Sequence, residues 1–322
     1  MAEITAAAVM KLREITGLPM MDCKQALQAT DGDFDKAQEW LRIKGKKWQD
    51  TKGAGRETST GRIAIYAELE PGAGAMIDIR CETAPVANNE YFITLANDLA
   101  KQLAKGPGAK TPEELLAQPS PSNPKQTLQQ QFDDLNNRIR EKFVLARIVR
   151  VEGPCAGYVH HNGGAGVLLE VQKGEAILAR DIAMHVTAMK PIVLRREEVD
   201  PAHVAKERDV LNQAMIAEGE TIKAEAEKVL AGPEQMIQDP NNLEKSVSSH
   251  NRARGELKKA EGMVKNKDRV IEGRMGLFFA ERCLLEQVHA NTGKYASKTI
   301  GDLAKAAGMT IVRFIHWELP KE

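Results

Sequence analysis

Histidines and cysteines are the residues of this chain that could do metal or catalytic chemistry, but their spacing favours neither. His160 and His161 are adjacent, and in the strand predicted there they would point to opposite faces, so one ion could not easily bind both. His185 and His289 have no partner that the sequence identifies, which favours structural or surface roles. The cysteines stand singly and form no CxxC pair, which argues against a zinc site of that kind and for reduced thiols. They are Cys23, Cys81, Cys155 and Cys283.

Glycine-rich and acidic segments could handle phosphate or protons, but none has the necessary pattern. Residues 108–111 and 293–295 fall short of GxxxxGK[ST], and residues 162–166 favour a hairpin turn. GxGxxG, HExxH and GxSxG do not occur. The acidic pairs 133–134 and 197–198 favour solvated charge, because neighbouring residues of a helix point in different directions. We therefore expect no catalytic residue, no cofactor and no metal, in a protein that is not an enzyme.

Charge and hydropathy exclude further classes. The 322 residues include 45 Lys and Arg against 45 Asp and Glu, without the basic excess typical of proteins that grip nucleic acid through phosphates. No apolar run reaches the ~18 residues of a membrane span. The N-terminus has neither a basic stretch nor an apolar core, so we expect no signal peptide and a cytoplasmic protein.

Two local basic segments remain candidates for RNA contact, although solvated charge is the favoured interpretation. One surrounds Trp48 and the other spans residues 252–269. Their basic residues are Lys44, Lys46, Lys47, Lys52, Arg56 and Arg62 in the first, and Arg252, Arg254, Lys258, Lys259, Lys265, Lys267 and Arg269 in the second.

The elements that must position any functional residue begin with a predicted bundle of three short helices over residues 1–45. Thr5 is placed to cap the first helix, Gly17 to end it, and the third would end near Gly45. Residues 46–61 lack an apolar period and predict a flexible linker, so we expect the bundle to move relative to the rest. The inner faces of the three helices would carry Ala8, Leu12 and Ile15, then Cys23, Ala26 and Leu27, then Phe34, Ala37 and Leu41.

Residues 62–152 predict a first α/β subdomain. Period-2 alternation indicates a half-buried strand followed by a hairpin turn and a return strand. The expected elements are a strand at 63–69, a turn at 71–74, a strand at 75–80, a helix at 91–105, a proline-rich spacer, a helix at 128–139 and a strand at 143–151.

Residues 153–199 and 286–322 predict a second subdomain that repeats the first at a distance of about 90 residues. Strand, turn, strand and helix recur in the same order, with the turn at 162–166. Residues 310–319 would add a closing strand. Residues 200–285, rich in charge, predict an inserted, protruding helical hairpin resembling a coiled coil, broken at 232–233 and 239–240. The whole predicts an α+β fold with duplicated antiparallel sheets.

Four segments, taken together, resemble the elongation factor Ts family. Residues 12–27 carry Thr-Gly, Met-Met-Asp-Cys-Lys and Ala-Leu as in its N-terminal signature, and the bundle is similar to ubiquitin-associated domains. Residues 182–191, 271–287 and 297–300 resemble later stretches of the family in the correct order, so that the resemblance covers nearly the whole chain.

The resemblance implies a guanine-nucleotide exchange factor that binds elongation factor Tu. Positions that match the family's contact residues would touch that partner. In the bundle these are Arg13, Met20, Met21 and Lys24, although the two methionines could instead be core of so small a bundle. In the core they are Thr83, Ala84, Pro85 and Val86, and also His160.

Two departures from the family pattern bear on activity. The family carries Thr-Asp-Phe-Val where this chain has Thr83-Ala84-Pro85-Val86, so the carboxylate and the aromatic wedge are missing and Pro85 offers a smaller apolar knob. Residues 219–265 have no clear counterpart in the family's shorter forms. Two alternatives therefore stay open. One is a Tu-binding scaffold or weak exchanger, and the other an RNA-binding assembly protein that uses the basic hairpin.

Overall fold

The computed structural model describes residues 4–48, 55–70, 72–231 and 240–320. The chain forms two compact units, the first comprising residues 1–190, 289–296 and 302–322, and the second residues 191–288 and 297–301. The finer division into five domain segments stays a prediction.

Three helices at the start of the first unit form the predicted bundle: α1 (Ala6–Thr16), α2 (Met20–Ala29) and α3 (Phe34–Trp48). Thr5 Oγ1 accepts a hydrogen bond from the Ala8 backbone N–H at 3.2 Å, and Gly17 ends α1 with a left-handed φ of 69°. Two expectations were wrong. Ile15 is 54% exposed, and α3 continues three residues past Gly45. The buried residues are Val9, Leu12, Leu18, Cys23, Ala26, Leu27, Ala37 and Leu41.

An antiparallel sheet in the order β1-β2-β3 follows, built from β1 (Thr60–Glu68), β2 (Ala73–Cys81) and β3 (Val144–Val151). The predicted turn at 71–74 is displaced, because Ala73 and Gly74 already belong to β2, while Pro71 lies outside the described residues. Helix α5 (Glu90–Lys105) covers one face with the predicted side chains Phe92, Leu95, Leu99 and Leu103, all fully buried.

Three further helices lie with α5 between β2 and β3 in the chain. They are α4 (Ala84–Ala87), α6 (Pro112–Leu116) and α7 (Leu128–Ile139). Helix α6 lies within the proline-rich spacer and was not expected there. Pro112 fits its first turn because proline lacks only an N–H that a helix start leaves unpaired. The predicted amphipathic helix at 128–139 matches α7, whose start carries a capping box formed by Thr127 and Gln130.

A second antiparallel sheet repeats the first. It has the order β4-β5-β6, with β4 (Cys155–Val159), β5 (Ala165–Gln172) and β6 (Thr310–Glu318), and α8 (Ala176–Met189) packs on it. In both sheets the third strand pairs with the second, and a register shift interrupts that pairing, at Asp78 in one sheet and at Glu170 in the other. The predicted α+β class, with N-terminal helices and antiparallel sheets, is confirmed.

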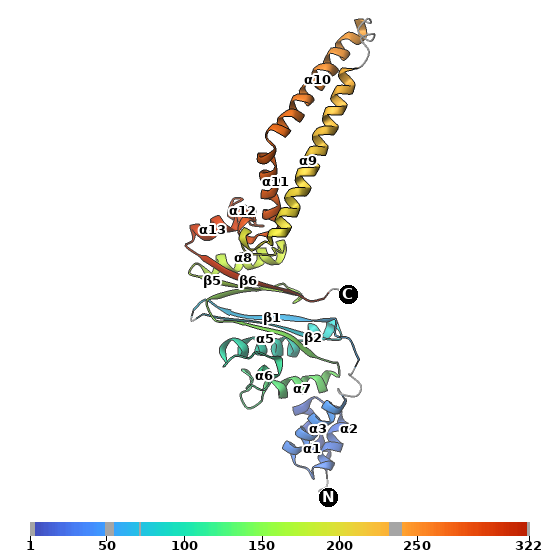
Figure 1. Ribbon diagram of the computed structural model, residues 1–322. Helices are drawn as coiled ribbons and strands as arrows, with labels where there is room; N and C mark the ends of the chain where they lie inside the picture. Colours follow the sequence, from blue (N-terminus) through green and yellow to red (C-terminus); the bar gives the residue numbers. More distant parts are fainter. Residues whose placement is uncertain (1–3, 49–54, 71, 232–239, 321–322) are drawn as a thin grey trace. The chain divides into compact units, whose positions relative to one another are not determined.

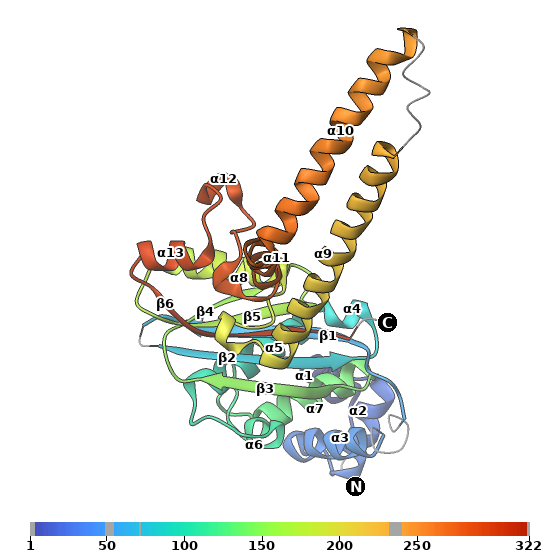
Figure 2. The same ribbon diagram turned by 45° about the horizontal axis from the view of Figure 1, so that its top comes forward.

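The two sheets lie face to face, with α5 and α8 on the outer sides (Figures 1 and 2). The faces share an apolar cluster formed by Ile63, Met76, Val151, Cys155 and Leu168. The prediction of a half-buried first strand was therefore wrong. Ile63 is fully buried against the second sheet, while the next residue, Ala64, is 4% exposed in the α5 cluster.

Glycines allow the strands of the two sheets to approach closely. A Cβ on Gly157 of β4 would lie 2.5 Å from Ile65 Cγ2 of β1, and one on Gly166 of β5 would lie 2.8 Å from Ile63 Cγ2. Both distances are shorter than non-bonded carbon atoms tolerate. The absence of a side chain at these positions is therefore a condition of the packing.

A buried carboxylate adds a polar connection between the sheets. Asp78 of β2 is fully buried and pairs with Arg80 at 3.0 Å and Arg147 of β3 at 2.8 Å. Arg147 also donates to the Glu318 carbonyl of β6 at 3.1 Å and lies over the Trp317 ring at 4.5 Å. A buried charge needs such partners because desolvation is costly.

The second unit contains a helical hairpin of α9 (Pro201–Leu230) against α10 (Pro240–Lys265) and α11 (Lys267–Arg282). Met215, Ile271, Met275 and Phe278 form its apolar seam. The separation of α10 from α11 at Asn266 was not predicted, and the predicted break at 232–233 lies outside the described residues. None of the described helices has the length and apolar character that crossing a membrane requires.

The glycine contact predicts the effect of adding one methyl group. Gly157→Ala should lower the free energy of unfolding by ~1–3 kcal/mol, because the new Cβ overlaps Ile65. Urea unfolding followed by circular dichroism measures this loss. Gly293→Ala is the control, since among the described residues only Asn291 Oδ1 lies near its Cβ, at 3.7 Å. Equal midpoints for the two variants would contradict the account of the packing.

Candidate partner-binding surfaces

The predicted contact residues of the bundle are all on its surface. Helix α2 begins directly after Pro19, which acts as its N-cap residue with a φ of −58°. Met20 and Met21 are 40% and 64% exposed, and Arg13 and Lys24 are also exposed. The alternative that both methionines belong to the core is wrong, because Cys23, Ala26 and Leu27 fill that side of α2.

The bundle exposes further large apolar side chains that the sequence did not single out. Met10 and Ile15 of α1 are each 54% exposed, and Ile43 of α3 is 62% exposed. A bundle of this size cannot bury every apolar side chain. The sequence carried no signal that Ile15 is exposed, because it follows the buried Leu12 by three residues, a spacing that places both on one helix face.

The segment Thr83, Ala84, Pro85 and Val86 lies at the start of α4, directly after β2. Glu141 fixes it, accepting hydrogen bonds from the Thr83 backbone N–H at 3.1 Å and from Thr83 Oγ1 at 2.6 Å. The first three residues are exposed, and Val86 packs against the core. The segment therefore presents Ala84 and Pro85 on a fixed turn.

Tyr91 is an exposed aromatic side chain close in sequence to this turn. It lies in the first turn of α5 and is 56% exposed. The Arg138 guanidinium lies 4.4 Å from the centre of its ring, which restrains the ring.

His160 lies in the turn after β4, where its backbone N–H donates to Ala165 O at 2.9 Å. Its Nδ1 is 3.3 Å from the Tyr158 hydroxyl, and its ring centre is 4.3 Å from that of His161. The expectation that the two histidines point to opposite faces of a strand was wrong, because β4 ends at Val159. Within the described part of the chain, no group of three or more His, Cys, Asp or Glu side chains could hold a metal ion.

His185 and His289 have partners that the sequence did not identify, and both are structural, which is one of the two roles that the sequence favoured. Both are buried, their ring centres are 5.3 Å apart, and each Nδ1 accepts a backbone N–H at 3.0 Å, from Ala290 and Asn291 respectively. The ring of Tyr295 lies 4.3 Å from that of His289, and Asp181 accepts from the Tyr295 hydroxyl and from Lys294 Nζ, both at 2.6 Å. These residues connect α8 to the segment before β6.

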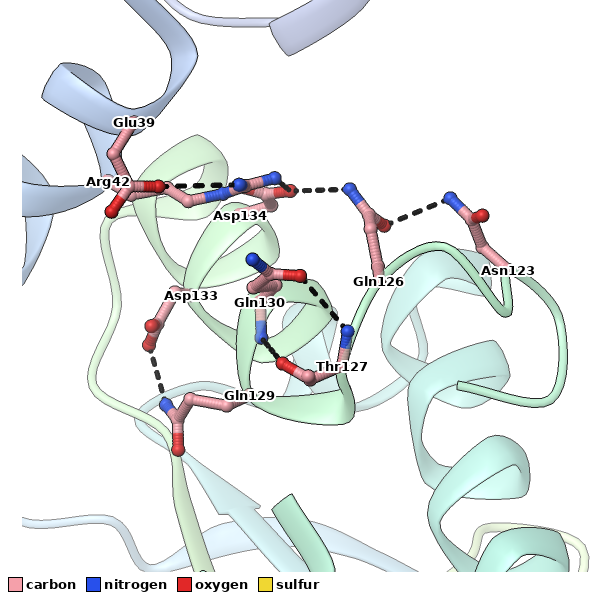
Figure 3. A network of polar contacts seen from close by, with 9 residues as sticks. All are labelled: Glu39, Arg42, Asn123, Gln126, Thr127, Gln129, Gln130, Asp133 and Asp134. Atoms are coloured by element: carbon pink, nitrogen blue, oxygen red, sulfur yellow. Dashed lines mark hydrogen bonds and ion pairs between the residues drawn. The ribbon is translucent and has the colours of Figure 1, made fainter. Parts of the chain in front are cut away.

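The acidic pair at 133–134 had been expected to be solvated, but one of its members makes specific contacts. Asp134 of α7 accepts two hydrogen bonds from Arg42 of α3, and Gln126 also reaches it at 3.3 Å (Figure 3). The other pair also makes specific contacts, since Glu198 accepts the Leu194 backbone N–H at 2.9 Å.

The described basic residues of the two segments are partly paired with other groups. In the first, Lys44 pairs with Asp22, Arg56 pairs with Glu82, and Arg62 donates to the Ala87 carbonyl at 3.3 Å. Lys52 and the side chains of Lys46 and Lys47 lie outside the described residues. In the second segment, residues 252–269 carry seven basic and three acidic side chains. Of these, Lys259 pairs with Glu256 at 3.4 Å. The RNA-binding alternative stays a hypothesis.

The predicted site residues thus lie on three parts of the first unit: the bundle, the α4 turn and the turn between β4 and β5. Exposed methionines and turns of this kind are typical of surfaces that contact another protein.

Comparison with known proteins narrows this class. The family model described as Elongation factor TS matches residues 82–321. Proteins named elongation factor Ts from Mycobacterium tuberculosis (strain H37Ra) and Saccharopolyspora erythraea are 33% and 34% identical to this chain, with 99% of each chain covered. A third, from Streptomyces griseus, is 34% identical with 98% of each chain covered. The chain belongs to the elongation factor Ts family and has its role in translation elongation.

The buried histidine predicts a dependence of stability on pH. Burial lowers the pKa of His289, with Asp181 opposing that shift and Lys294 adding to it. Between this lowered pKa and the usual value of ~6.5, the unfolded chain binds more protons than the folded one, so the free energy of unfolding falls as the pH falls through that window.

His289→Gln should reduce the loss of unfolding free energy between pH 8 and pH 5.5, measured by urea titration at each pH. Some dependence should remain, because burial also lowers the pKa of His316. An unchanged dependence in His289→Gln would rule out this contribution.

Proposed function

We propose that this protein promotes release of GDP from elongation factor Tu by binding the nucleotide-free form of Tu more tightly than the GDP-bound form. If it binds empty Tu more tightly by some factor, linkage requires that it weakens GDP binding by the same factor. Such coupling needs a surface that fits a distorted nucleotide and magnesium site of Tu. It needs no group transfer, cofactor or metal of its own, so the proposal includes that the protein is not an enzyme.

The observation that carries the proposal is the exposed Met20-Met21 pair at the start of α2, in a chain of this family. Unbranched, polarisable side chains adapt to an irregular apolar surface, which suits a first contact with a partner that changes shape. Arg13 of α1 and Lys24 of α2 are also exposed and would add charge recognition.

The core would supply the second contact. Thr83, Ala84, Pro85 and Val86 would press near the nucleotide site of Tu, with Pro85 as the exposed apolar knob, and His160 would contact Tu from the turn after β4. Glu141 holds Thr83, so the knob is rigid even though it is small. Two contacts on one chain raise the effective concentration of the second once the first has formed.

Release of a fluorescent GDP analogue from the cognate Tu, followed by stopped flow with excess unlabelled GDP, tests the exchange activity. The protein should accelerate release. The double variant Met20→Gln, Met21→Gln should need a roughly tenfold higher concentration for the same rate, because it loses about 1.4 kcal/mol of contact energy. Met189→Gln is the matched control, since Met189 is 49% exposed on α8 and is not one of the predicted contact residues.

If the unmodified protein binds Tu but does not accelerate GDP release, the exchange proposal is refuted. That result would instead support the alternative of a scaffold or weak exchanger, which the small knob at Ala84 and Pro85 favours.

The relative weight of the two contacts gives a further expectation. Pro85→Ala should change the release rate less than deletion of residues 1–50 does, because the knob is small whereas the bundle carries both methionines. The same stopped-flow assay measures both variants, and circular dichroism confirms that each is folded. A larger effect of Pro85→Ala would show that the turn dominates.

A further inference from the structure

Two ion-paired contacts hold the bundle on α7. In the first, Arg42 of α3 donates to both carboxylate oxygens of Asp134, from Nε to Oδ1 at 2.7 Å and from Nη2 to Oδ2 at 2.9 Å (Figure 3). This bidentate geometry fixes direction as well as distance. Glu39, one helical turn before Arg42, lies 3.7 Å from its guanidinium.

Asp22 makes the second contact. Its carboxylate accepts from Arg140 Nη2 at 2.7 Å and from Lys44 Nζ at 2.9 Å, so it joins α2 to α3 and to the end of α7. Arg140 caps α7 in the left-handed conformation, with a φ of 63°, which is uncommon for a residue other than glycine.

These contacts leave the proposed partner-binding face uncovered. Asp22 lies between Met21 and Lys24 in the first turn of α2, yet Met21 remains 64% exposed and Lys24 is exposed. Successive residues of a helix point in different directions, so one turn can anchor the bundle through Asp22 and present its neighbours.

The contact between the bundle and α7 is polar and incompletely packed. Asn137 Oδ1 of α7 is buried without a hydrogen-bond partner and lies against Gly45 of α3. A cavity of about 180 Å³ is lined by Leu18, Asp22, Leu41, Lys44, Gly45, Asn137 and Arg140. The contact around this cavity is therefore not filled by apolar side chains.

We propose that the ion pairs Arg42–Asp134 and Asp22–Arg140 orient the bundle on α7 and so present Met20, Met21 and Lys24 to the partner. This inference rests on the function proposed above. Arg42, Asp134 and Arg140 are positioning residues, since they would orient Met20, Met21 and Lys24 without touching the partner themselves. A fixed orientation lowers the ordering cost of association.

The orientation is measured by the distance between spin labels on Gln28→Cys in α2 and Lys101→Cys in α5, two exposed positions in a chain whose native cysteines are buried. The parent protein should give one narrow distance distribution. Arg42→Gln, and separately Asp134→Asn, should broaden this distribution. The ratio of bundles in the native orientation to bundles in other orientations should fall about fivefold. The double variant should add little to either single one, because both changes break the same pair.

Association with Tu is then measured by stopped flow for the same variants. Both single variants should associate more slowly, in proportion to the oriented fraction that their distance distributions give and by about fivefold at most. They should keep an unchanged melting temperature. Arg313→Gln is the matched control, since it breaks an Arg–carboxylate contact of 2.7 Å to Glu170 in the second sheet and should change neither readout.

Three results would overturn the inference. They are a distance distribution that stays narrow in Arg42→Gln and Asp134→Asn, a broadened distribution with unchanged association, or additive effects in the double variant. A parent protein that does not accelerate GDP release would instead refute the function proposed above, whatever the distances show.

Discussion

The face-to-face contact of the two three-stranded sheets is the constraint on which the rest of the first unit depends. Ile63 and Ile65 of β1 fit against Gly166 and Gly157 because neither glycine has a side chain. The contact removes apolar surface from water on both sheets at once. The buried Asp78 adds direction, since Arg147 connects its carboxylate to the backbone of β6.

This contact decides where everything else can lie. Each sheet gives one face to the other sheet, so α5 and α8 must cover the outer faces. Little of either sheet is left for recognition, and the residues that we propose to meet a partner come from the edges. The α4 turn with Pro85 and the turn with His160 are such edges.

The bundle, unlike the sheets, leaves apolar side chains exposed. It is too small to bury all of its apolar side chains, and its exposed Met20 and Met21 are available for a partner because other residues attach it to the core. That attachment is charged at Arg42, Asp134, Asp22 and Arg140, and it is incompletely packed around Asn137. A polar attachment of this kind specifies orientation more than it contributes stability.

The sequence by itself determined the features that follow from local periodicity and capping. The Thr5 cap, the Gly17 stop, the inner face of α5 and the repeated order of strand, turn, strand and helix were all predictable, because each depends on residues close in the chain. Its motifs also indicated the family.

Only the tertiary structure decided the rest. The burial of both faces of β1, the pairing of His185 with His289 and the ion pair between Arg42 and Asp134 each join residues far apart in sequence. A single sequence carries no local signal for such contacts. They arise when whole elements pack, and packing selects partners by shape and charge in three dimensions.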